Sequence, residues 1–360
     1  MKKECGDEKV DILVVGESIE ANLNENKIIV KGIKDGTSQI KINVNGIEYK
    51  DIKVMVGWIA IYTEEDLINI KNGLNKSYII MKDISLTKEW IAIGDNTNQF
   101  NGVLEGNYHK ISGLNINKEG ASNQGLFGYI GGEGQVRNLS IEGTVKGGAD
   151  TGMLVGYNHG IIENVKVSGE VTSNNSYAGG LVGNSSGTIE KCYSEVTVGA
   201  TGGNVGGLVG YNVGTIRRSA SVGNVIGSRD SVGGLVGQSY SGTIENVYST
   251  GEVSGSSYVG GLVGYLNVGA ITNAYSISKV SGKDPAYTGG LLGRSGGGAI
   301  TNAYWTPEKA GVQTSKGGTM IETLGAMQIQ TTYEGFDFTS ESPIWVMKTY
   351  PELNYNFGGK

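Results

Sequence analysis

The most regular feature of the chain is a leucine set among glycines, which recurs seven times at spacings of 27 to 29 residues. These leucines are Leu126, Leu154, Leu181, Leu208, Leu235, Leu262 and Leu291. Each is followed by a turn and then by an aliphatic residue: Val136, Ile162, Ile189, Ile216, Ile244, Ile271 and Ile300. Six periods continue with a valine: Val145, Val171, Val196, Val225, Val253 and Val280. Three short apolar stretches per period, separated by turns, predict three short strands per repeat.

A repeat of this length is too thin to bury its own apolar side, so the repeats must stack on one another. Strands one period apart then pair in parallel at a distance of about 4.8 Å. The sequence therefore predicts an all-β fold, a parallel β-solenoid over residues 120–305 with coils of about 27 residues. The general chirality of parallel crossovers predicts right-handed coils. Helices are disfavoured, because no 3.6-residue period appears and glycine costs about 1 kcal/mol inside a helix.

The pattern within one repeat predicts which side chains face the interior. Val247 is predicted to point inward and Tyr248 outward, with Asn246 forming a bend between them. Other repeats place Lys191 or Arg218 at the position of Asn246, which indicates that the bend faces solvent.

The segments that flank the repeats are predicted to cap the solenoid, whose open ends would otherwise expose unpaired strand edges. Residues 57–119 are predicted to form a cap helix and the first irregular coils, because Thr63 and Asp66 have the spacing of a capping box. Residues 306–360 are predicted to form a C-terminal cap with a second short helix over Met320 to Gln330. The bulky aromatic residues at this end are interpreted as a plug: Trp305, Phe336, Phe338, Trp345 and Tyr350.

Residues 1–56 follow a different pattern, in which apolar and polar residues alternate in short runs. Turn signals at Asp35-Gly36 and Asn45-Gly46 separate these runs. The pattern predicts a small antiparallel β-domain.

Composition adds limits on partners. Glycine accounts for 61 of the 360 residues without the period of collagen, and the net charge of −6 argues against nucleic acid or an anionic membrane as the main partner.

Two cysteines cannot form a disulfide framework, and Cys192 falls at an inward position, which predicts a buried free thiol. No apolar stretch is long enough to span a bilayer. The first residues lack the apolar segment of a signal peptide, so the chain is expected either to be cytoplasmic or to start after a removed signal.

Stacking places residues one period apart in columns, so paired carboxylates are the first candidates for catalysis. Glu163 with Glu190, and Glu170 with Glu195, are predicted to stack about 5 Å apart, a separation that suits a retaining glycosidase. Both pairs lie in columns that are polar in every repeat, so we interpret them as a solvated face; a polysaccharide-active enzyme is the alternative. The two histidines are His109 and His159. They form no metal-binding motif, and the sequence predicts no catalytic residue, no metal ligand and no cofactor.

Tyrosine is the most suggestive side chain, with 19 copies against five phenylalanines. One column, three residues after the signature leucine, holds Tyr129, Tyr157, Tyr211 and Tyr265. A second column, predicted to point outward, holds Tyr193, Tyr248, Tyr275 and Tyr304. Tyr177, Tyr258 and Tyr287 precede the signature by four residues. Exposed tyrosines bind sugars or protein partners with little loss of entropy, so the two columns are the candidate ligand-binding residues; a plainer interpretation is that they stack on one another and shield the backbone.

The phrase Gly-Gly-Leu-Val-Gly followed by Gly-Thr-Ile and Tyr-Ser, as in residues 233–255, resembles the GLUG repeat of bacterial surface proteins, including adhesins and the non-catalytic regions of IgA-protease-like proteins. Residues 58–116 and 304–353 resemble the usual flanks of such repeats, and residues 10–56 resemble a shortened bacterial Ig-like domain. The resemblance implies a non-enzymatic protein, secreted or displayed at the cell surface, that acts in adhesion or as a rigid scaffold. Its implied partner is a glycan or protein on a host, a cell wall or a neighbouring cell. Self-association into an extracellular structural subunit is a further alternative.

Overall fold

The computed structural model describes residues 9–24 and 27–355. The chain divides into two compact units, Met1–Ala60 with Lys76–Ile79 and Ile61–Asn75 with Ile80–Lys360.

The first unit contains an antiparallel β-domain, as the alternating pattern predicted. Its three-stranded sheet has the order β1-β4-β5, and a separate hairpin pairs β2 with β3. The strands are β1 (Val10–Val15), β2 (Ile19–Asn24), β3 (Lys27–Gly32), β4 (Gly36–Val44) and β5 (Ile47–Val56). Asn45 and Gly46 join β4 to β5 with φ angles of 52° and 78°. Two left-handed residues in succession are what a tight hairpin turn requires, which explains the Asn-Gly pair at this place.

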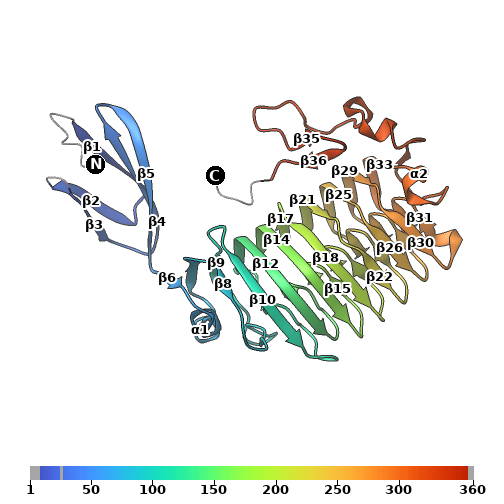
Figure 1. The fold of residues 1–360 in the computed structure, drawn as a ribbon, viewed down its shortest axis with the longest axis horizontal. Helices are drawn as coiled ribbons and strands as arrows, with labels where there is room; N and C mark the ends of the chain where they lie inside the picture. The colour runs from blue at the N-terminus through green and yellow to red at the C-terminus, as the bar shows by residue number, and fades with distance from the viewer. Residues whose placement is uncertain (1–8, 25–26, 356–360) are drawn as a thin grey trace. The chain divides into compact units, whose positions relative to one another are not determined.

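The second unit is a parallel β-solenoid whose stacked coils contribute to three sheets (Figure 1). Seven strands form one sheet: β11 (Phe127–Ile130), β13 (Val155–Asn158), β16 (Val182–Ser185), β20 (Val209–Asn212), β24 (Val236–Ser239), β28 (Val263–Leu266) and β32 (Leu292–Ser295). Five two-residue strands form another: β15 (Ala178–Gly179), β19 (Val205–Gly206), β23 (Val232–Gly233), β27 (Val259–Gly260) and β31 (Thr288–Gly289).

The largest sheet carries the longest face of each coil. Its repeat strands are β10 (Lys110–Asn117), β12 (Gln135–Gly147), β14 (Ile161–Ser173), β17 (Thr188–Glu190), β18 (Tyr193–Ala200), β21 (Thr215–Ser221), β22 (Val225–Gly227), β25 (Thr243–Ser249), β26 (Glu252–Gly255), β29 (Ala270–Ser276), β30 (Lys279–Gly282) and β33 (Ala299–Trp305). Before them in the chain come β6 (Trp58–Ile61), β7 (Ser77–Ile80), β8 (Ile84–Ser85) and β9 (Val103–Glu105). In the coils that contain β12 and β14, this face consists of a single long strand. In each of the next four coils it is divided into two short strands.

Backbone hydrogen bonds confirm the predicted period. The amide of Leu181 donates to the carbonyl of Leu208, and that of Leu208 donates to Leu235, each at 2.9 Å. One member of the valine column was assigned wrongly: Val171 and Val225 both lie beside Val198, not Val196. The valine follows the aliphatic residue of its coil by nine residues, as in Ile162 to Val171 and Ile216 to Val225, so Val198 rather than Val196 has the repeat spacing after Ile189.

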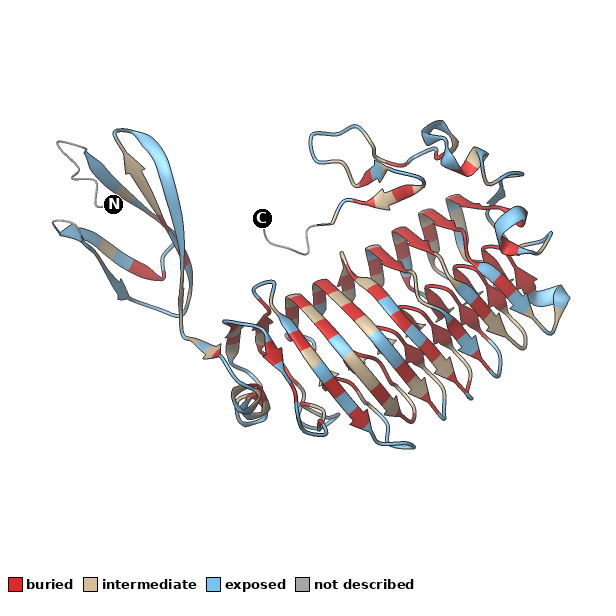
Figure 2. Ribbon diagram, in the orientation of Figure 1, coloured by how far each residue is buried: buried red, intermediate tan, exposed pale blue. Residues whose placement is uncertain are grey.

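The interior is narrow and filled by aliphatic side chains, which appear as buried positions along every coil in Figure 2. Ile189, Ile216 and Ile244 are completely buried. Buried polar side chains bond between coils, since Asn158 Nδ2 donates to Ser185 Oγ at 3.2 Å. Cys192 is a free buried thiol as predicted, and burial raises its pKa to about 12.

The bend before the outward tyrosine is a column of left-handed residues. Its members are Asn138, Asn164, Lys191, Arg218, Asn246, Asn273 and Asn302, with φ between 47° and 54°. Asparagine adopts this conformation more readily than most residues, which explains its repetition here. The expectation that the column faces solvent is wrong for Asn164 and Asn246, which are 8% and 4% exposed. Asn164 Nδ2 donates to Asn138 Oδ1 at 2.8 Å, so these side chains form a ladder instead of pointing into water.

The N-terminal cap of the solenoid contains the expected capping box. The hydroxyl of Thr63 accepts from the amide of Asp66, and the Asp66 carboxylate accepts from the amide of Thr63. This capping box lies at the start of α1 (Glu64–Ile68), which continues into η1 (Asn69–Asn72). Leu67 and Ile70 are completely buried beneath this cap.

The C-terminal segment differs from the prediction. The helix expected over Met320 to Gln330 is absent, and its place is taken by β34 (Thr319–Met320) and two 3₁₀ turns, η3 (Ala326–Gln328) and η4 (Gln330–Thr332). The remaining elements at this end are η2 (Pro285–Tyr287), α2 (Pro307–Ala310), β35 (Trp345–Met347) and β36 (Pro351–Leu353). The segment bends because Leu324 and Met327 are each held against the side of the solenoid.

The aromatic residues that were interpreted together as a plug lie in two different places. Trp305 points inward, in register with Ser276, where it occupies the space beside Gly290. Phe336 and Trp345 instead lie against the largest sheet, so the C-terminal segment covers one side of the coils (Figure 1).

Candidate functional site

The outward side chains of the seven-stranded sheet form a continuous column. In strand order they are Tyr129, Tyr157, Asn184, Tyr211, Gln238, Tyr265 and Arg294. The four tyrosines predicted to share one position therefore do so. Each of the four is partly exposed, so the column lies on an accessible face.

Four further tyrosines lie on the same face; three of them share the repeat position four residues before the signature leucine, and Tyr240 has no repeat signal. We call the set the tyrosine flank: Tyr129, Tyr157, Tyr177, Tyr211, Tyr240, Tyr258, Tyr265 and Tyr287. Tyr177 and Tyr258 come from left-handed turns, with φ of 67° and 53°, and lean onto the column. Tyr240 lies in a turn that differs from coil to coil, so no repeat signal marks it.

The rings of the flank support one another. Tyr129 and Tyr157 are stacked with centroids 4.8 Å apart and planes 5° apart, and His159 lies 5.1 Å from Tyr157. Tyr177 meets Tyr211 edge-on at 5.3 Å. Stacking along the axis leaves ring edges and hydroxyl groups facing outward, which suits hydrogen bonding as well as apolar contact.

The second tyrosine column was predicted to be accessible, and for three of its members this is wrong. Tyr248, Tyr275 and Tyr304 are 5%, 1% and 6% exposed. They point away from the coil interior, but the C-terminal segment covers them. Tyr193 remains partly exposed and meets the ring of Tyr355 edge-on at 5.6 Å.

Specific hydrogen bonds hold this cover in place. The Tyr275 hydroxyl donates to the carbonyl of Pro351 at 2.5 Å, and Trp345 Nε1 donates to Asn246 Oδ1 at 3.1 Å. The second column is therefore part of the packed structure, and the tyrosine flank is the accessible aromatic surface.

Burial of the covered tyrosines has an electrostatic consequence. It raises the pKa of the Tyr248 and Tyr333 phenols and raises that of Tyr275 well above the ordinary value of 10.0. The cause in each case is the loss of hydration of the phenolate, reinforced by neighbouring phenols.

We expect these three phenols to stay protonated through pH 10 and to ionise only when their cover opens. Because the folded pKa lies above the unfolded value of about 10, the stability gained from their burial is complete below that pH and is lost as the pH rises above it. Tyrosinate absorbance and circular dichroism, followed together during an alkaline titration, test this expectation. A full tyrosine titration completed before any loss of β-structure would contradict it.

The carboxylate pairs proposed as a possible catalytic site are held in ion pairs. Glu163 and Glu190 are neighbours in register as predicted, but Lys191 Nζ lies 3.0 Å from the Glu163 carboxylate and Arg217 lies 2.6 Å from that of Glu190. Each carboxylate of this pair therefore has a basic partner, an arrangement typical of paired surface charges.

The second pair does not exist. The structure aligns Glu170 with Thr197, and Glu195 with Ser168, because the register of this strand differs by two residues from the one assumed. Lys166 Nζ lies 3.0 Å from the Glu195 carboxylate.

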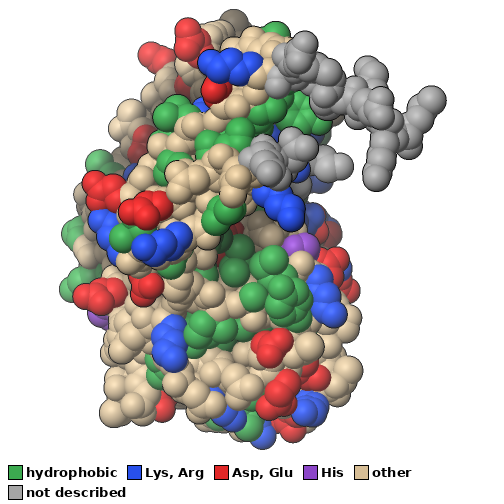
Figure 3. Space-filling model, turned by 90° about the vertical axis from the view of Figure 1, so that its left-hand side faces the viewer, with side chains coloured by type: hydrophobic (Ala, Val, Ile, Leu, Met, Phe, Trp, Pro, Cys, Tyr) green, Lys and Arg blue, Asp and Glu red, His purple; other side chains and the backbone are tan. Residues whose placement is uncertain are grey.

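Other charges are also distributed in pairs between coils. Lys110 contacts Glu142, and Lys279 lies 3.3 Å from Glu252. On the face shown in Figure 3, acidic and basic side chains are interspersed, and neither sign forms a continuous patch. Each such pair contributes little to the free energy of unfolding, and together the pairs balance positive and negative charge between the coils.

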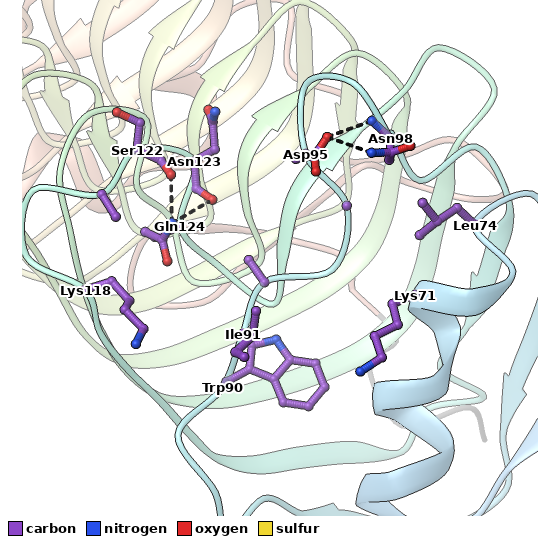
Figure 4. Close-up of a pocket in the computed structure, with 13 residues that line it drawn as sticks. Lys71, Leu74, Trp90, Ile91, Asp95, Asn98, Lys118, Ser122, Asn123 and Gln124 are labelled. Atoms are coloured by element: carbon purple, nitrogen blue, oxygen red, sulfur yellow. Dashed lines mark hydrogen bonds between the residues drawn. The ribbon is translucent and has the colours of Figure 1, made fainter.

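A recess of about 650 Å³ lies beside the coil that carries Tyr129 (Figure 4). Its walls come from the segments around Trp90 and Asp95 and from the turn that contains Gln124. Trp90 is buried, with Nε1 donating to the carbonyl of Leu126 at 2.9 Å, and Asp95 accepts from the amides of Thr97 and Asn98. Trp90 and Asp95 are thus engaged in local structure, while the side chains of Lys71 and Lys118 also line the recess.

The repeat geometry agrees with a known motif. The family model of the GLUG motif matches residues 174–199 and 229–254, which cover parts of two coils. Both segments run from the left-handed turn through the glycine-flanked leucine to the valine strand, the same course that the unmatched coils take. Two stretches of the solenoid therefore match the GLUG motif.

Two similar proteins contain related sequence. A protein described as a Gly-rich membrane protein, from Evansella cellulosilytica, is 42% identical over 120 residues, which is 30% of this chain and 14% of that protein. Halomucin from Haloquadratum walsbyi is 42% identical over 82 residues, 22% of this chain and 1% of halomucin. The chain thus spans only a small part of the length of either relative. Within residues 9–24 and 27–355, no helix is long and apolar enough to cross a membrane.

Proposed function

We propose that this GLUG-repeat protein is a non-enzymatic protein of the cell surface or the secreted fraction, which binds a glycan or protein ligand through its tyrosine flank. One observation carries the proposal: of two tyrosine columns on the coils, the chain covers one and leaves the other accessible. The relatives described as a membrane protein and as halomucin support a location at or outside the cell surface.

The flank has the properties of a recognition surface. Tyrosine supplies large contact area with few rotatable bonds, and the rings of Tyr157 and Tyr211 are already fixed by His159 and Tyr177. Such prior packing lowers the entropy lost when a ligand is bound. A rigid solenoid keeps these groups in line along its axis, as an adhesive or scaffolding protein requires.

The proposal predicts that Tyr157→Ser combined with Tyr211→Ser weakens ligand binding by at least about tenfold, since aromatic contacts at an interface contribute more than 1 kcal/mol each. Binding of the wild-type chain and the double variant to an array of neutral and acidic glycans measures this. Tyr49→Ser is the matched control, because Tyr49 is 76% exposed and belongs to the other unit. Glycan binding that is the same for the wild type and the double variant would refute a role for the flank.

A further inference from the structure

Arg294 ends the central column of the tyrosine flank in an unusual setting. Its guanidinium lies over the rings of both Tyr258 and Tyr265, with distances of 4.7 and 4.9 Å to the ring centroids. Nη1 also donates to the Tyr258 hydroxyl at 2.6 Å. Two aromatic faces and one hydrogen bond therefore hold the side chain in a single orientation.

The guanidinium of Arg294 still has N–H donors with which to bind a ligand. A guanidinium carries five N–H donors, and the contact with Tyr258 uses one of them. Its planar fork matches the two oxygens of a carboxylate, a geometry that a lysine cannot reproduce. Arg294 is thus oriented in advance for an anionic group.

A second cation stands near the same tyrosines without a carboxylate partner. Lys316 Nζ lies 5.6 Å from the ring centroid of Tyr287, which in turn meets Tyr258 edge-on at 5.1 Å. Among the described residues, neither Arg294 nor Lys316 has an acidic partner, whereas Lys110, Lys166 and Lys279 of the largest sheet are each paired with a glutamate.

The acidic side chain of the turn before Tyr287, Asp284, accepts hydrogen bonds from its own surroundings. One carboxylate oxygen of Asp284 accepts from the amide of Ala286 and the other from the Ser257 hydroxyl. Counted against Arg294 and Lys316, the single carboxylate of Asp284 leaves the cluster with a net positive charge, whereas the acidic Asp150 lies beside Asn184 in another part of the column.

We propose that Arg294, together with Tyr258, Tyr265 and Lys316, forms a subsite for a sugar carboxylate, and that the ligand of the tyrosine flank is an acidic polysaccharide containing uronic acid residues. This inference rests on the proposed function of the flank. A polysaccharide fits better than an acidic peptide because the amide of Gln238 lies between Tyr211 and Tyr265 along the axis, so amide and hydroxyl groups alternate where an extended sugar chain presents hydroxyl groups.

The test compares oligogalacturonate with a neutral maltooligosaccharide of equal length, by calorimetry on the full chain. We expect the acidic oligosaccharide to bind at least about tenfold more tightly at low salt, and this preference to shrink as salt screens the charges. Arg294→Gln should abolish the preference, Arg294→Lys should restore it in part, and Lys316→Gln should reduce it.

The control is Arg229→Gln, which removes an exposed arginine that makes no aromatic or acidic contact among the described residues. Equal affinity for both oligosaccharides, or an unchanged preference in the Arg294→Gln variant, overturns the carboxylate subsite. If neutral binding then still depends on Tyr157 and Tyr211, the flank proposal survives without it. Binding of polyglutamate in preference to oligogalacturonate refutes the choice of a polysaccharide. Binding of neither sugar refutes the uronic acid subsite, and the glycan array with the Tyr157 and Tyr211 variants then decides the flank proposal separately.

Discussion

Alanine at Gly206 is expected to prevent the coils from closing. A Cβ atom built there would overlap the carbonyl oxygen of Val209, and it would lie 2.7 Å from the amide nitrogen of Gly237. Both neighbours are backbone atoms, so no side chain can move aside. We expect a loss of at least about 3 kcal/mol in the free energy of unfolding, or failure to fold.

Gly199→Ala is the matched control from the same coil. The only atom within 4 Å of its Cβ would be Thr172 Cγ2, at 3.8 Å. In a strand, alanine is favoured over glycine by about 0.5–1 kcal/mol, so this variant should be unchanged or slightly more stable. Urea unfolding followed by circular dichroism compares the two variants, and similar midpoints would show that the glycines are not needed for coil closure.

The same contact explains why the repeat was visible in the sequence. Gly179, Gly233 and Gly260 would each overlap the carbonyl of the valine three residues later, as Gly206 does. Because the constraint acts within every coil, it leaves a glycine at every period. The stacking order and the inward leucines could therefore be predicted from local spacing alone.

The features that the sequence could not predict depend on contacts between residues that are not one repeat apart. Trp345 bonds to Asn246 across 99 residues, and no repeat marks that contact. The tyrosines beneath it look the same in sequence as those of the accessible flank, so the two columns could not be distinguished. The misplaced Val196 and the pairing of Glu170 with Glu195 have a simpler cause: the strand keeps the 27-residue offset, which places Val171 beside Val198 and Glu170 beside Thr197.

The cover also determines which part of the solenoid is available for binding. Tyr248 and Tyr275 stack with centroids 5.2 Å apart and planes 5° apart, much as Tyr129 and Tyr157 do on the opposite column. The two columns therefore carry similar side chains. They differ in exposure, because the C-terminal segment covers one of them. If the segment were released, the protein would present a second aromatic surface.

Trp345→Ala is expected to release that segment while leaving the coils folded. Trp345 is completely buried, stacks on Phe336 at 4.5 Å and lies 6.2 and 6.1 Å from the rings of Tyr248 and Tyr275. Replacing a buried tryptophan by alanine costs about 3–5 kcal/mol, and here it also leaves Asn246 Oδ1 without its indole donor. Each coil contacts mainly its neighbours, so the loss should stay local to residues 321–355.

Hydrogen exchange measured by mass spectrometry tests this, with faster exchange expected in β35 and β36 and unchanged protection in β20 and β24. Val346→Ala is the matched control, because Val346 is the next residue of the same strand and is 39% exposed. If both variants exchange alike, the indole does not hold the cover. If Trp345→Ala unfolds the coils as well, the C-terminal segment is part of the solenoid core rather than a layer upon it, and the second tyrosine column cannot be exposed without losing the fold.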